Sequence, residues 1–339
     1  MKAAVFKEVG KPLVLEECPE PKIRADELLV RVKAVGVCGS DLHASEASWT
    51  PTDIVMGHEF SGEVAAVGDQ VTGWSVGDRA VPLAKLVCGE CPSCRRENYS
   101  DCENSDLIGF SSNVDGAYAE YARVSAATAL RLPDGVGYMD AAVVEPLAVG
   151  YSTVRKAELK MSDSVLIIGA GPIGLCVAQW CKHFGVTDIA VSELNASRLS
   201  LAEEMGANIL IDGNDVDDPA AEFERIAGRA PSVIVEAVGV PGMIQRCIEM
   251  ASNNARIVVV GVCFGYDRFQ PMLCFEKRLQ LIFAAGYRVE DFAEILKLMD
   301  QGRIVAEPLI SHRISLEELP EMFETMRKPT DQIKVIVEL

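Results

Sequence analysis

The chain has 339 residues, 49% hydrophobic and 24% charged, the composition of a water-soluble protein with enough apolar sequence for two domain cores. Its formal net charge of −18 makes nucleic acid and anionic membrane surfaces poor partners, because both are negatively charged themselves. The sequence shows no apolar run of the roughly 18 residues that span a membrane, and its first residues lack the apolar core of a signal peptide. We therefore expect a cytoplasmic protein whose cysteines are thiols.

Residues 1–148 are rich in Val and Gly and contain short alternating runs of apolar and polar residues, such as 28–38 and 60–68. Gly, Pro and Asp turns bound these runs. The pattern predicts an antiparallel β region with long loops.

Four cysteines of this region follow the spacing C-x2-C-x2-C-x7-C; they are Cys88, Cys91, Cys94 and Cys102. The short gaps let tight turns direct successive sulfurs to one point, and the longer loop returns the fourth sulfur to it. Four thiolates without an open position are typical of a structural zinc site. A redox pair needs two cysteines at a helix start. An iron–sulfur cluster also takes four thiolates, but nothing nearby indicates electron transfer. We predict structural zinc in a lobe over residues 85–105.

A second group of possible metal ligands is spread over segments 35–43, 57–60 and 143–150. Its members are Cys38, Ser40, Asp41, His43, His58, Glu59 and Glu145. Three such donors around a divalent ion would leave one position open, as in catalytic zinc sites. Each also has an ordinary interpretation: Cys38 as a core residue, His58 as a hydrogen-bonded loop residue, and Glu145 as a helix cap. Their number favours a metal site.

From residue 149 strands and helices alternate, which predicts a parallel, doubly wound sheet. We expect strands over 164–171, 188–193, 208–212, 232–239, 255–263 and 279–286, and helices over 172–185, 196–207 and 241–252.

The first of these strands leads into a G-x-G-x-x-G motif, formed by Gly169, Gly171 and Gly174. The motif follows a strand and opens a helix, which is the context that dinucleotide binding requires. Gly169 permits the turn, Gly171 lets the backbone approach a pyrophosphate, and Gly174 allows close helix packing. The helix N-terminus then receives the anion, and Pro172 costs no hydrogen bond there. We also assign Ile173, Val238 and Gly261 to this dinucleotide site.

Glu193 ends the second strand, nineteen residues after Gly174. A carboxylate at this place accepts hydrogen bonds from ribose hydroxyls and repels a 2′-phosphate, which favours NAD over NADP. Arg198 lies close by in the sequence and offers a binding partner for a 2′-phosphate instead.

The chain continues with helices over 289–302 and 316–327 and a final strand over 333–339. Because a terminal strand often pairs with an earlier sheet, we expect 287–339 to rejoin the first domain. The predicted domains are thus 1–148 with 287–339, and a dinucleotide-binding domain over 149–286.

The sequence resembles the zinc-dependent medium-chain dehydrogenases over essentially its whole length. The resemblance rests on "CGSDLH", "GHEFSGEVAAVG", the four-cysteine lobe, "EPLAVG" and "GAGPIG", all in family order. The similarity is greatest to the polyol, threonine and butanediol dehydrogenases, in which a Glu in "EPL", here Glu145, replaces a ligand cysteine of the ethanol-oxidising enzymes. The resemblance implies an α/β fold: a GroES-like β-rich catalytic domain plus a Rossmann domain.

The resemblance also implies a function, the transfer of a hydride between a secondary alcohol or polyol and NAD. It implies two Zn²⁺ per chain, with the catalytic one on Cys38, His58 and either Glu145 or Glu59. The substrate hydroxyl would lose its proton through Ser40 to His43. Family members are usually homodimers or homotetramers, and strand 255–263 is a candidate contact.

Other functions stay open: an NADPH-dependent reductase of aldehydes or ketones, or a non-catalytic zinc- and nucleotide-binding protein. The second would be expected to lack one of Cys38, Ser40, His43 and His58, and all four are present. A zinc-ribbon nucleic-acid binder conflicts with the net charge. Candidate substrate contacts are Trp49, Ile54, Phe110, Leu147 and Tyr287. No Lys or Arg stands out among them, which favours an uncharged secondary alcohol or diol.

Overall fold

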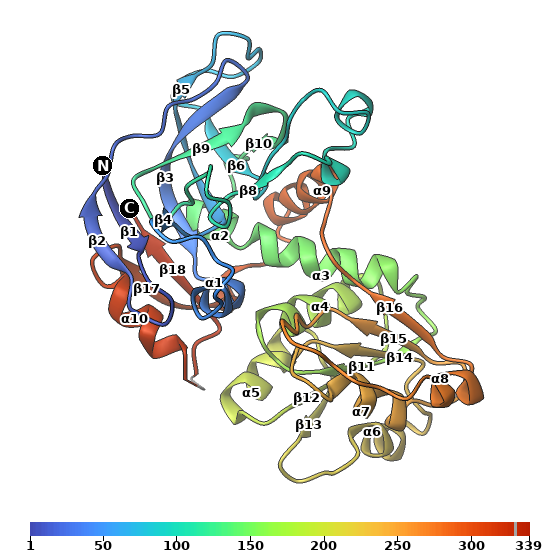
Figure 1. The fold of residues 1–339 in the computed structure, drawn as a ribbon. Helices are drawn as coiled ribbons and strands as arrows, with labels where there is room; N and C mark the ends of the chain where they lie inside the picture. Colours follow the sequence, from blue (N-terminus) through green and yellow to red (C-terminus); the bar gives the residue numbers. More distant parts are fainter. Residues whose placement is uncertain (329–330) are drawn as a thin grey trace. The chain divides into compact units, whose positions relative to one another are not determined.

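The computed structural model describes residues 1–328 and 331–339, and these form two compact units (Figure 1). Unit 1 comprises Met1–Glu145 and Arg288–Leu339, and unit 2 comprises Pro146–Tyr287. The expected boundaries, after 148 and after 286, differ from those after 145 and 287 by three residues and one residue. The C-terminal segment therefore returns to unit 1. No described helix combines the length and the apolar composition that a membrane crossing needs.

Unit 1 is built mainly on antiparallel strands. Its largest sheet has the order β10–β6–β5–β3–β18–β17, and β9 also pairs with β3. The strands are β3 (Glu27–Gly36), β5 (Glu59–Val67), β6 (Arg79–Pro82), β9 (Tyr121–Ser125), β10 (Ala129–Arg131), β17 (Ile310–Ser315) and β18 (Lys334–Glu338). A smaller sheet has the order β2 (Val14–Glu17), β1 (Lys2–Phe6) and β4 (Ile54–Val55).

Strand β3 is the centre of the large sheet. Eight of its ten residues are buried, most of them in continuous runs, as expected for a strand covered on both faces. It pairs antiparallel with β5, β9 and β18. The predicted strand over 28–38 ends earlier, at Gly36, and Cys38 instead caps the short helix α1 (Gly39–Ser45). Because β3 ends at Gly36 and α1 begins at Gly39, Cys38 lies in the short link between the central strand and this helix.

The remaining helices of unit 1 are α2 (Tyr138–Ala142), α9 (Val289–Asp300) and α10 (Leu319–Met326). Helix α10 begins three residues later than the predicted 316, because Leu316 and Glu318 still belong to the turn after β17. Strand β17 lies outside the predicted elements, because four of its six residues are polar and the sequence shows no apolar run there.

Unit 2 holds a six-stranded parallel sheet in the order β13–β12–β11–β14–β15–β16, so the predicted doubly wound sheet is confirmed. The strands are β11 (Ser164–Ile168), β12 (Asp188–Glu193), β13 (Ile209–Asp212), β14 (Val233–Glu236), β15 (Arg256–Val259) and β16 (Gln280–Phe283). The helices are α3 (Val144–Lys156), whose first two residues belong to unit 1, α4 (Pro172–His183), α5 (Ala196–Glu204), α6 (Pro219–Ala227), α7 (Met243–Met250) and α8 (Pro271–Lys277).

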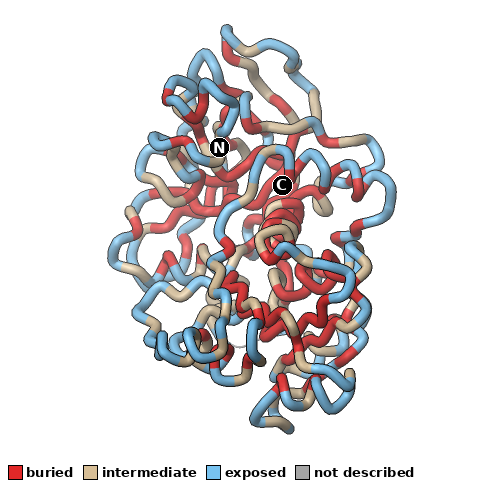
Figure 2. Tube along the Cα trace, turned by 90° about the vertical axis from the view of Figure 1, so that its right-hand side faces the viewer, coloured by how far each residue is buried: buried red, intermediate tan, exposed pale blue. Residues whose placement is uncertain are grey.

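The strand order of unit 2 reverses between β11 and β14. Every residue of both strands is buried; Figure 2 shows where buried and exposed residues lie along the whole chain. In an open parallel sheet, ligands bind beyond the carboxyl ends of the strands at such a reversal. The G-x-G-x-x-G loop directly follows β11, so the fold puts the predicted dinucleotide loop at this place.

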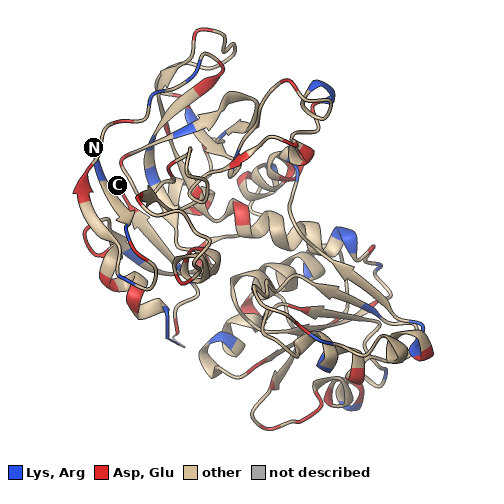
Figure 3. Ribbon diagram, in the orientation of Figure 1, with Lys and Arg blue, Asp and Glu red and all other residues tan. Residues whose placement is uncertain are grey.

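The charged residues do not separate by sign between the units. Lys and Arg positions are scattered among the more numerous Asp and Glu positions on both units (Figure 3).

Candidate metal and dinucleotide sites

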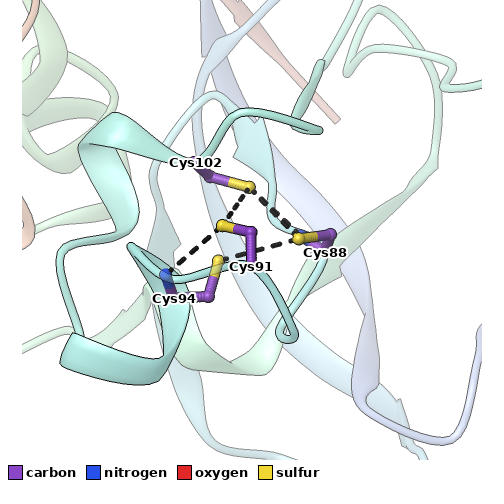
Figure 4. Close-up of side chains that lie close together, drawn as sticks. All are labelled: Cys88, Cys91, Cys94 and Cys102. Atoms are coloured by element: carbon purple, nitrogen blue, oxygen red, sulfur yellow. Dashed lines mark hydrogen bonds between the residues drawn. The ribbon is translucent and has the colours of Figure 1, made fainter.

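The four predicted zinc thiols converge in the structure (Figure 4). The Sγ–Sγ distances are 3.6 Å for Cys88–Cys102, and 4.0 Å for both Cys88–Cys94 and Cys91–Cys102. All four residues are free thiols, and a disulfide would bring two sulfurs to about 2 Å. Tetrahedral Zn–S bonds of about 2.3 Å separate sulfurs by about 3.8 Å, so the spacing fits a closed zinc site.

The lobe around these thiols has little apolar material of its own. Its core consists of Val87 and three of the cysteines, with Cys88 and Tyr99 against it. Backbone N–H groups of Cys88 and Cys94 donate to sulfurs of the other cysteines, at 3.4 Å each. Such bonds favour thiolates: backbone donors lower the pKa of Cys91 to about 6, whereas burial raises that of Cys94 to about 12. A metal ion bound to these thiolates would replace the missing core of the lobe.

Three donors of the second predicted group also meet. One ligand atom each of Cys38, His58 and Glu59 lies within 4.8 Å of the others; we call this set the mixed-donor cluster. Cys38 lies at the start of α1, while His58 and Glu59 lie at the start of β5. His58 is 7% exposed and Glu59 1% exposed. A half-buried thiol that converges with a buried imidazole and a buried carboxylate in this way completes a donor set that fits zinc.

Asp41 holds the cluster together from the first turn of α1. Its Oδ1 lies 3.2 Å from Nδ1 of His58, and its Oδ2 accepts hydrogen bonds from the backbone of Cys38 at 3.3 Å and from the Tyr118 hydroxyl at 2.6 Å. A carboxylate on Nδ1 favours the tautomer that presents Nε2 to a metal.

The electrostatics of the metal-free cluster favour the protonated forms of His58 and Cys38, so zinc would have to displace these protons. Burial alone would lower the pKa of His58, but the Asp41 carboxylate and the hydrogen bonds outweigh burial and raise it well above its usual range. Burial, and then the negative charge of Glu59, raise the pKa of the Cys38 thiol. A divalent cation would relieve this repulsion between the thiolate and the carboxylate.

Glu59 has a second partner that the sequence analysis missed. The ammonium Nζ of Lys334 lies 2.9 Å from Oε1 and 2.6 Å from Oε2 of Glu59, and donates to the carbonyl of Val37 at 3.2 Å. Lys334 begins β18, and the neighbouring backbone bond from Val37 N to Val335 O, 2.9 Å, places it beside the start of α1. A side chain on Gly36 would overlap the Glu59 carboxylate, so glycine leaves room for this ion pair.

The other predicted site residues, Ser40, His43 and the alternative ligand Glu145, are not part of the mixed-donor cluster. The hydroxyl of Ser40 donates to Sγ of Cys38 at 3.1 Å. His43, three residues further along α1, is exposed. Glu145 is the second residue of α3. Burial lowers the pKa of Lys334, but the negative charge of Glu59 and, by a smaller amount, that of Glu145 raise it.

The glycine loop of unit 2 has the predicted geometry. Gly169 has φ +99°, a region that L side chains rarely adopt. A side chain on Gly174 would overlap the Gly169 carbonyl, so α4 packs directly on the turn. A Cβ built on Gly171 meets no atom within 4 Å, which leaves the backbone there open to a ligand. Pro172 is the first residue of α4, followed by Ile173.

Glu193 is fixed by the backbone around it. Its Oε2 accepts from Ala170 N at 2.7 Å, inside the glycine loop, and its Oε1 accepts from Leu194 N at 2.8 Å and Asn195 N at 3.0 Å. Asn195 then caps α5, whose third residue is Arg198. The carboxylate is therefore held at the end of β12, beside the loop.

Val238 and Gly261 follow β14 and β15 and are joined by a residue that the sequence analysis missed. Glu236, 1% exposed, accepts from Val238 N and Gly239 N through Oε1, at 2.8 Å each. A Cβ on Gly261 would lie 2.6 Å from Glu236 Oε2, so only glycine fits there. In the sequence, Glu236 could have been singled out because it is the one acidic residue at the end of an otherwise apolar strand.

The candidate substrate contacts divide. The Phe110 ring lies against His58, with centroids 5.1 Å apart, and Trp49 is 58% exposed. Ile54 packs in the core of unit 1, and Leu147 is fully buried in unit 2. Contacts of these residues with a substrate stay predictions.

Two family models match the chain. The alcohol dehydrogenase GroES-like domain matches residues 24–134, and the zinc-binding dehydrogenase matches residues 172–301. The first contains the mixed-donor cluster and the four-cysteine lobe, and the second begins at the helix that the glycine loop opens.

Whole-chain relatives agree with these matches. (R,R)-butanediol dehydrogenase of Bacillus subtilis is 33% identical over 341 residues, which cover 96% of each chain. A zinc-binding dehydrogenase from Sinorhizobium meliloti, solved with NADP, superposes with a TM-score of 0.89 at 28% identity, covering 100% of this chain and 99% of that one. An alcohol dehydrogenase from Escherichia coli CFT073, complexed with NADH, gives the same TM-score, identity and coverage. The chain belongs to the zinc-containing medium-chain alcohol dehydrogenase family, whose members are NAD(P)-dependent oxidoreductases that bind zinc.

Proposed function

We propose that this protein transfers a hydride between an uncharged secondary alcohol, diol or polyol and NAD, and catalyses the reverse reduction of the matching ketone. The observation that carries the proposal is the mixed-donor cluster, in which a half-buried thiol converges with a buried imidazole and a buried carboxylate. The same chain holds a glycine loop with a fixed acidic residue, Glu193, beside it.

The catalytic zinc is assigned to Cys38, His58 and one carboxylate. Glu59 lies within the cluster, but both of its oxygens accept from Lys334. Glu145 is the alternative, at the start of α3. Zinc affinities of Glu59→Gln and Glu145→Gln distinguish the two, because loss of a ligand weakens binding far more than loss of a neighbour. The second zinc is assigned to the four-cysteine lobe.

The zinc ion, when bound, acts as a Lewis acid that lowers the pKa of a substrate hydroxyl, and NAD accepts the hydride. The chain supplies the path for the proton. Ser40 lies beside Cys38, and we assign its hydroxyl the role of accepting the substrate proton. His43 lies three residues on, on the same face of α1, and is exposed. An imidazole with access to water releases the proton to solvent near neutral pH.

The preference for NAD rests on Glu193. Three backbone N–H groups hold its carboxylate in place, so it cannot turn away from a 2′-phosphate without losing them. The second candidate is an NADPH-dependent aldehyde or ketone reductase. It is favoured by Arg198, in the first turn of α5, and by the NADP found with one relative.

The substrate assignment rests on two points. The relative from Bacillus subtilis is named for a diol, and Phe110 places an apolar ring against His58. An uncharged carbon chain bearing a hydroxyl group fits such a wall better than a carboxylate or phosphate does.

One kinetic panel tests the proposal. Initial rates are measured with 2,3-butanediol isomers, sorbitol, threonine, simple secondary alcohols and a sugar phosphate, each with NAD and with NADP. The proposal requires the highest kcat/KM for an uncharged secondary hydroxyl with NAD. A clear NADP preference supports the reductase. Failure of every alcohol with two zinc ions bound per chain overturns both candidates and leaves the non-catalytic alternative.

We further propose a homodimer or homotetramer, formed through the sheet of unit 2. The expected contact strand, β15, lies inside the sheet, whereas β16 lies at its edge. Phe283 of β16 is 61% exposed and Phe275 of α8 77% exposed. An uncharged edge strand with apolar side chains is a template for pairing with a second copy. Sedimentation of wild type and Phe283→Glu tests this, since the charge should shift the assembly toward monomers.

A further inference from the structure

Tyr118 is connected to the mixed-donor cluster by a chain of buried hydrogen bonds. Its hydroxyl donates to Oδ2 of Asp41 at 2.6 Å, and Oδ1 of Asp41 lies 3.2 Å from Nδ1 of His58. Tyr118 and Asp41 are 0% exposed and His58 is 7% exposed. Water therefore does not compete for the hydroxyl or the carboxylate.

Packing explains the aromatic ring of Tyr118 but not its hydroxyl. The ring lies edge-on to Phe323 of α10, with centroids 6.4 Å apart, and a Cβ built on Gly57 would come within 2.6 Å of it. A phenylalanine would fill this space equally well. A buried hydroxyl is costly unless it is hydrogen-bonded, and its partner here is the Asp41 carboxylate.

The backbone around Tyr118 is also fixed against the segment that carries His58. Gly116 N donates to Val55 O at 2.7 Å, Ala117 N to Gly57 O at 2.8 Å, and Tyr118 N to Met56 O at 3.0 Å. The hydroxyl and the backbone of Tyr118 thus define the position of Asp41 relative to His58.

We propose that Tyr118 is a positioning residue of the catalytic metal site. Its hydroxyl fixes the Asp41 carboxylate, and Asp41 in turn holds Nδ1–H of His58, so that Nε2 is presented to the metal before the metal arrives. This inference rests on the proposed function, because it takes the mixed-donor cluster to be a zinc site.

The test is the rate at which a chromogenic chelator, 4-(2-pyridylazo)resorcinol, removes zinc from the folded, fully loaded protein. The kinetic phase that is absent in Cys38→Ser belongs to the mixed-donor cluster. Tyr118→Phe removes only the hydroxyl and should accelerate this phase about 10- to 100-fold, the usual effect of losing a partner of a metal ligand. The phase from the four-cysteine lobe should not change.

Tyr121→Phe is the matched control. Tyr121 lies three residues away, and its hydroxyl accepts from Arg31 Nε at 3.3 Å. This variant also loses one tyrosine hydrogen bond, but should leave both phases unchanged. Equal release rates in wild type and Tyr118→Phe overturn the inference. If wild type and Cys38→Ser release the same amount of zinc, the assignment of the metal site fails instead.

Coupling to Asp41 separates positioning from general stability. If Tyr118 acts through Asp41, Asp41→Asn combined with Tyr118→Phe should accelerate release by less than the product of the two separate effects. A full product shows that Tyr118 acts independently of Asp41 and overturns the inference.

A further readout uses the wild-type chain and does not depend on the variant folding. The hydroxyl proton of the tyrosine with nuclear Overhauser contacts to the Phe323 ring should resonate downfield, and its shift should change when zinc is removed. A hydroxyl signal that is the same with and without zinc contradicts the inference.

Discussion

The ammonium group of Lys334 lies 2.6 and 2.9 Å from the two carboxylate oxygens of Glu59, and the two side chains are 2% and 1% exposed. The residues are 275 positions apart in the sequence. The pair joins β18, which begins at Lys334, to β5, which begins at Glu59. The C-terminal strand therefore contributes a residue to the surroundings of the metal site. The ammonium group also balances the negative charge of the Glu59 carboxylate, which lies close to Cys38.

Lys334→Met should destabilise the protein strongly, because it leaves the Glu59 carboxylate buried without its partner. Removal of one member of a buried ion pair costs about 3–5 kcal/mol of unfolding free energy. The loss should be smaller with zinc bound, since the cation then neutralises Glu59. Urea unfolding with and without EDTA measures both effects.

Lys297→Met serves as the control for that substitution, because its pair with Glu294 is exposed and such pairs contribute little. An equal loss of stability in the two variants would contradict a special role of the Lys334 pair.

Cys38→Ser should abolish turnover and leave the fold intact. A serine hydroxyl is a poor zinc ligand compared with a thiolate, and Cys38 is only half-buried, so the loss of its sulfur should cost little core packing. Zinc content should fall from two to one per chain by atomic absorption, with an unchanged circular dichroism spectrum. Retained activity would refute the ligand assignment.

Cys94→Ser should remove the other zinc and loosen the four-cysteine lobe. The lobe has only Val87 and its cysteines as core, so the metal supplies its stability. Limited proteolysis should cut within residues 85–107, while zinc at the mixed-donor cluster stays bound. Cys247→Ser, a buried thiol of unit 2, is the comparison; cleavage at the lobe in that variant would argue against a local effect.

Glu193→Ala should weaken the discrimination between NAD and NADP. The substitution removes both the acceptor for ribose hydroxyls and the charge that repels a 2′-phosphate. We expect kcat/KM for NAD to fall about tenfold or more, the effect of losing a charged hydrogen bond, and the NADP value to rise. An unchanged NAD/NADP ratio of kcat/KM would show that Glu193 does not contact the cofactor.

The stability of unit 2 should depend on pH through Asp163. Burial would raise the pKa of this carboxyl, but hydrogen bonds from Arg256, Lys160 N and Ser232 outweigh burial and lower it. A lowered folded pKa stabilises the protein above the ordinary Asp pKa near 3.9, and this contribution is lost as pH falls through the folded value.

Asp163→Asn should therefore cost about 1–3 kcal/mol at pH 7, and the difference from wild type should shrink as the pH is lowered below 4. Urea unfolding at several pH values measures it. Asp69→Asn, at an exposed position, should match wild type throughout. A difference that stays constant with pH would assign the effect to packing rather than to charge.

Local sequence patterns predicted the four-cysteine lobe, the glycine turn and the parallel sheet. The spacing of the four cysteines predicted their convergence, because short gaps in the chain keep the four sulfurs close together in space. Gly169 and Gly174 predicted a tight strand-to-helix turn, since a side chain at either position conflicts with that turn. The order of strands and helices predicted the parallel sheet.

The details of the metal site came only from tertiary structure. In the sequence, Lys334 is the second residue of an ordinary predicted strand over 333–339, and Tyr118 is one more aromatic residue in a β region. Their positions near Cys38 and His58 depend on the register of β18 on β3 and on the pairing of residues 116–118 with 55–57. Local patterns determine which residues are able to bind a metal. Contacts between distant segments decide which of them are held in place and with what charge around them, because burial and pairing are properties of the folded chain alone.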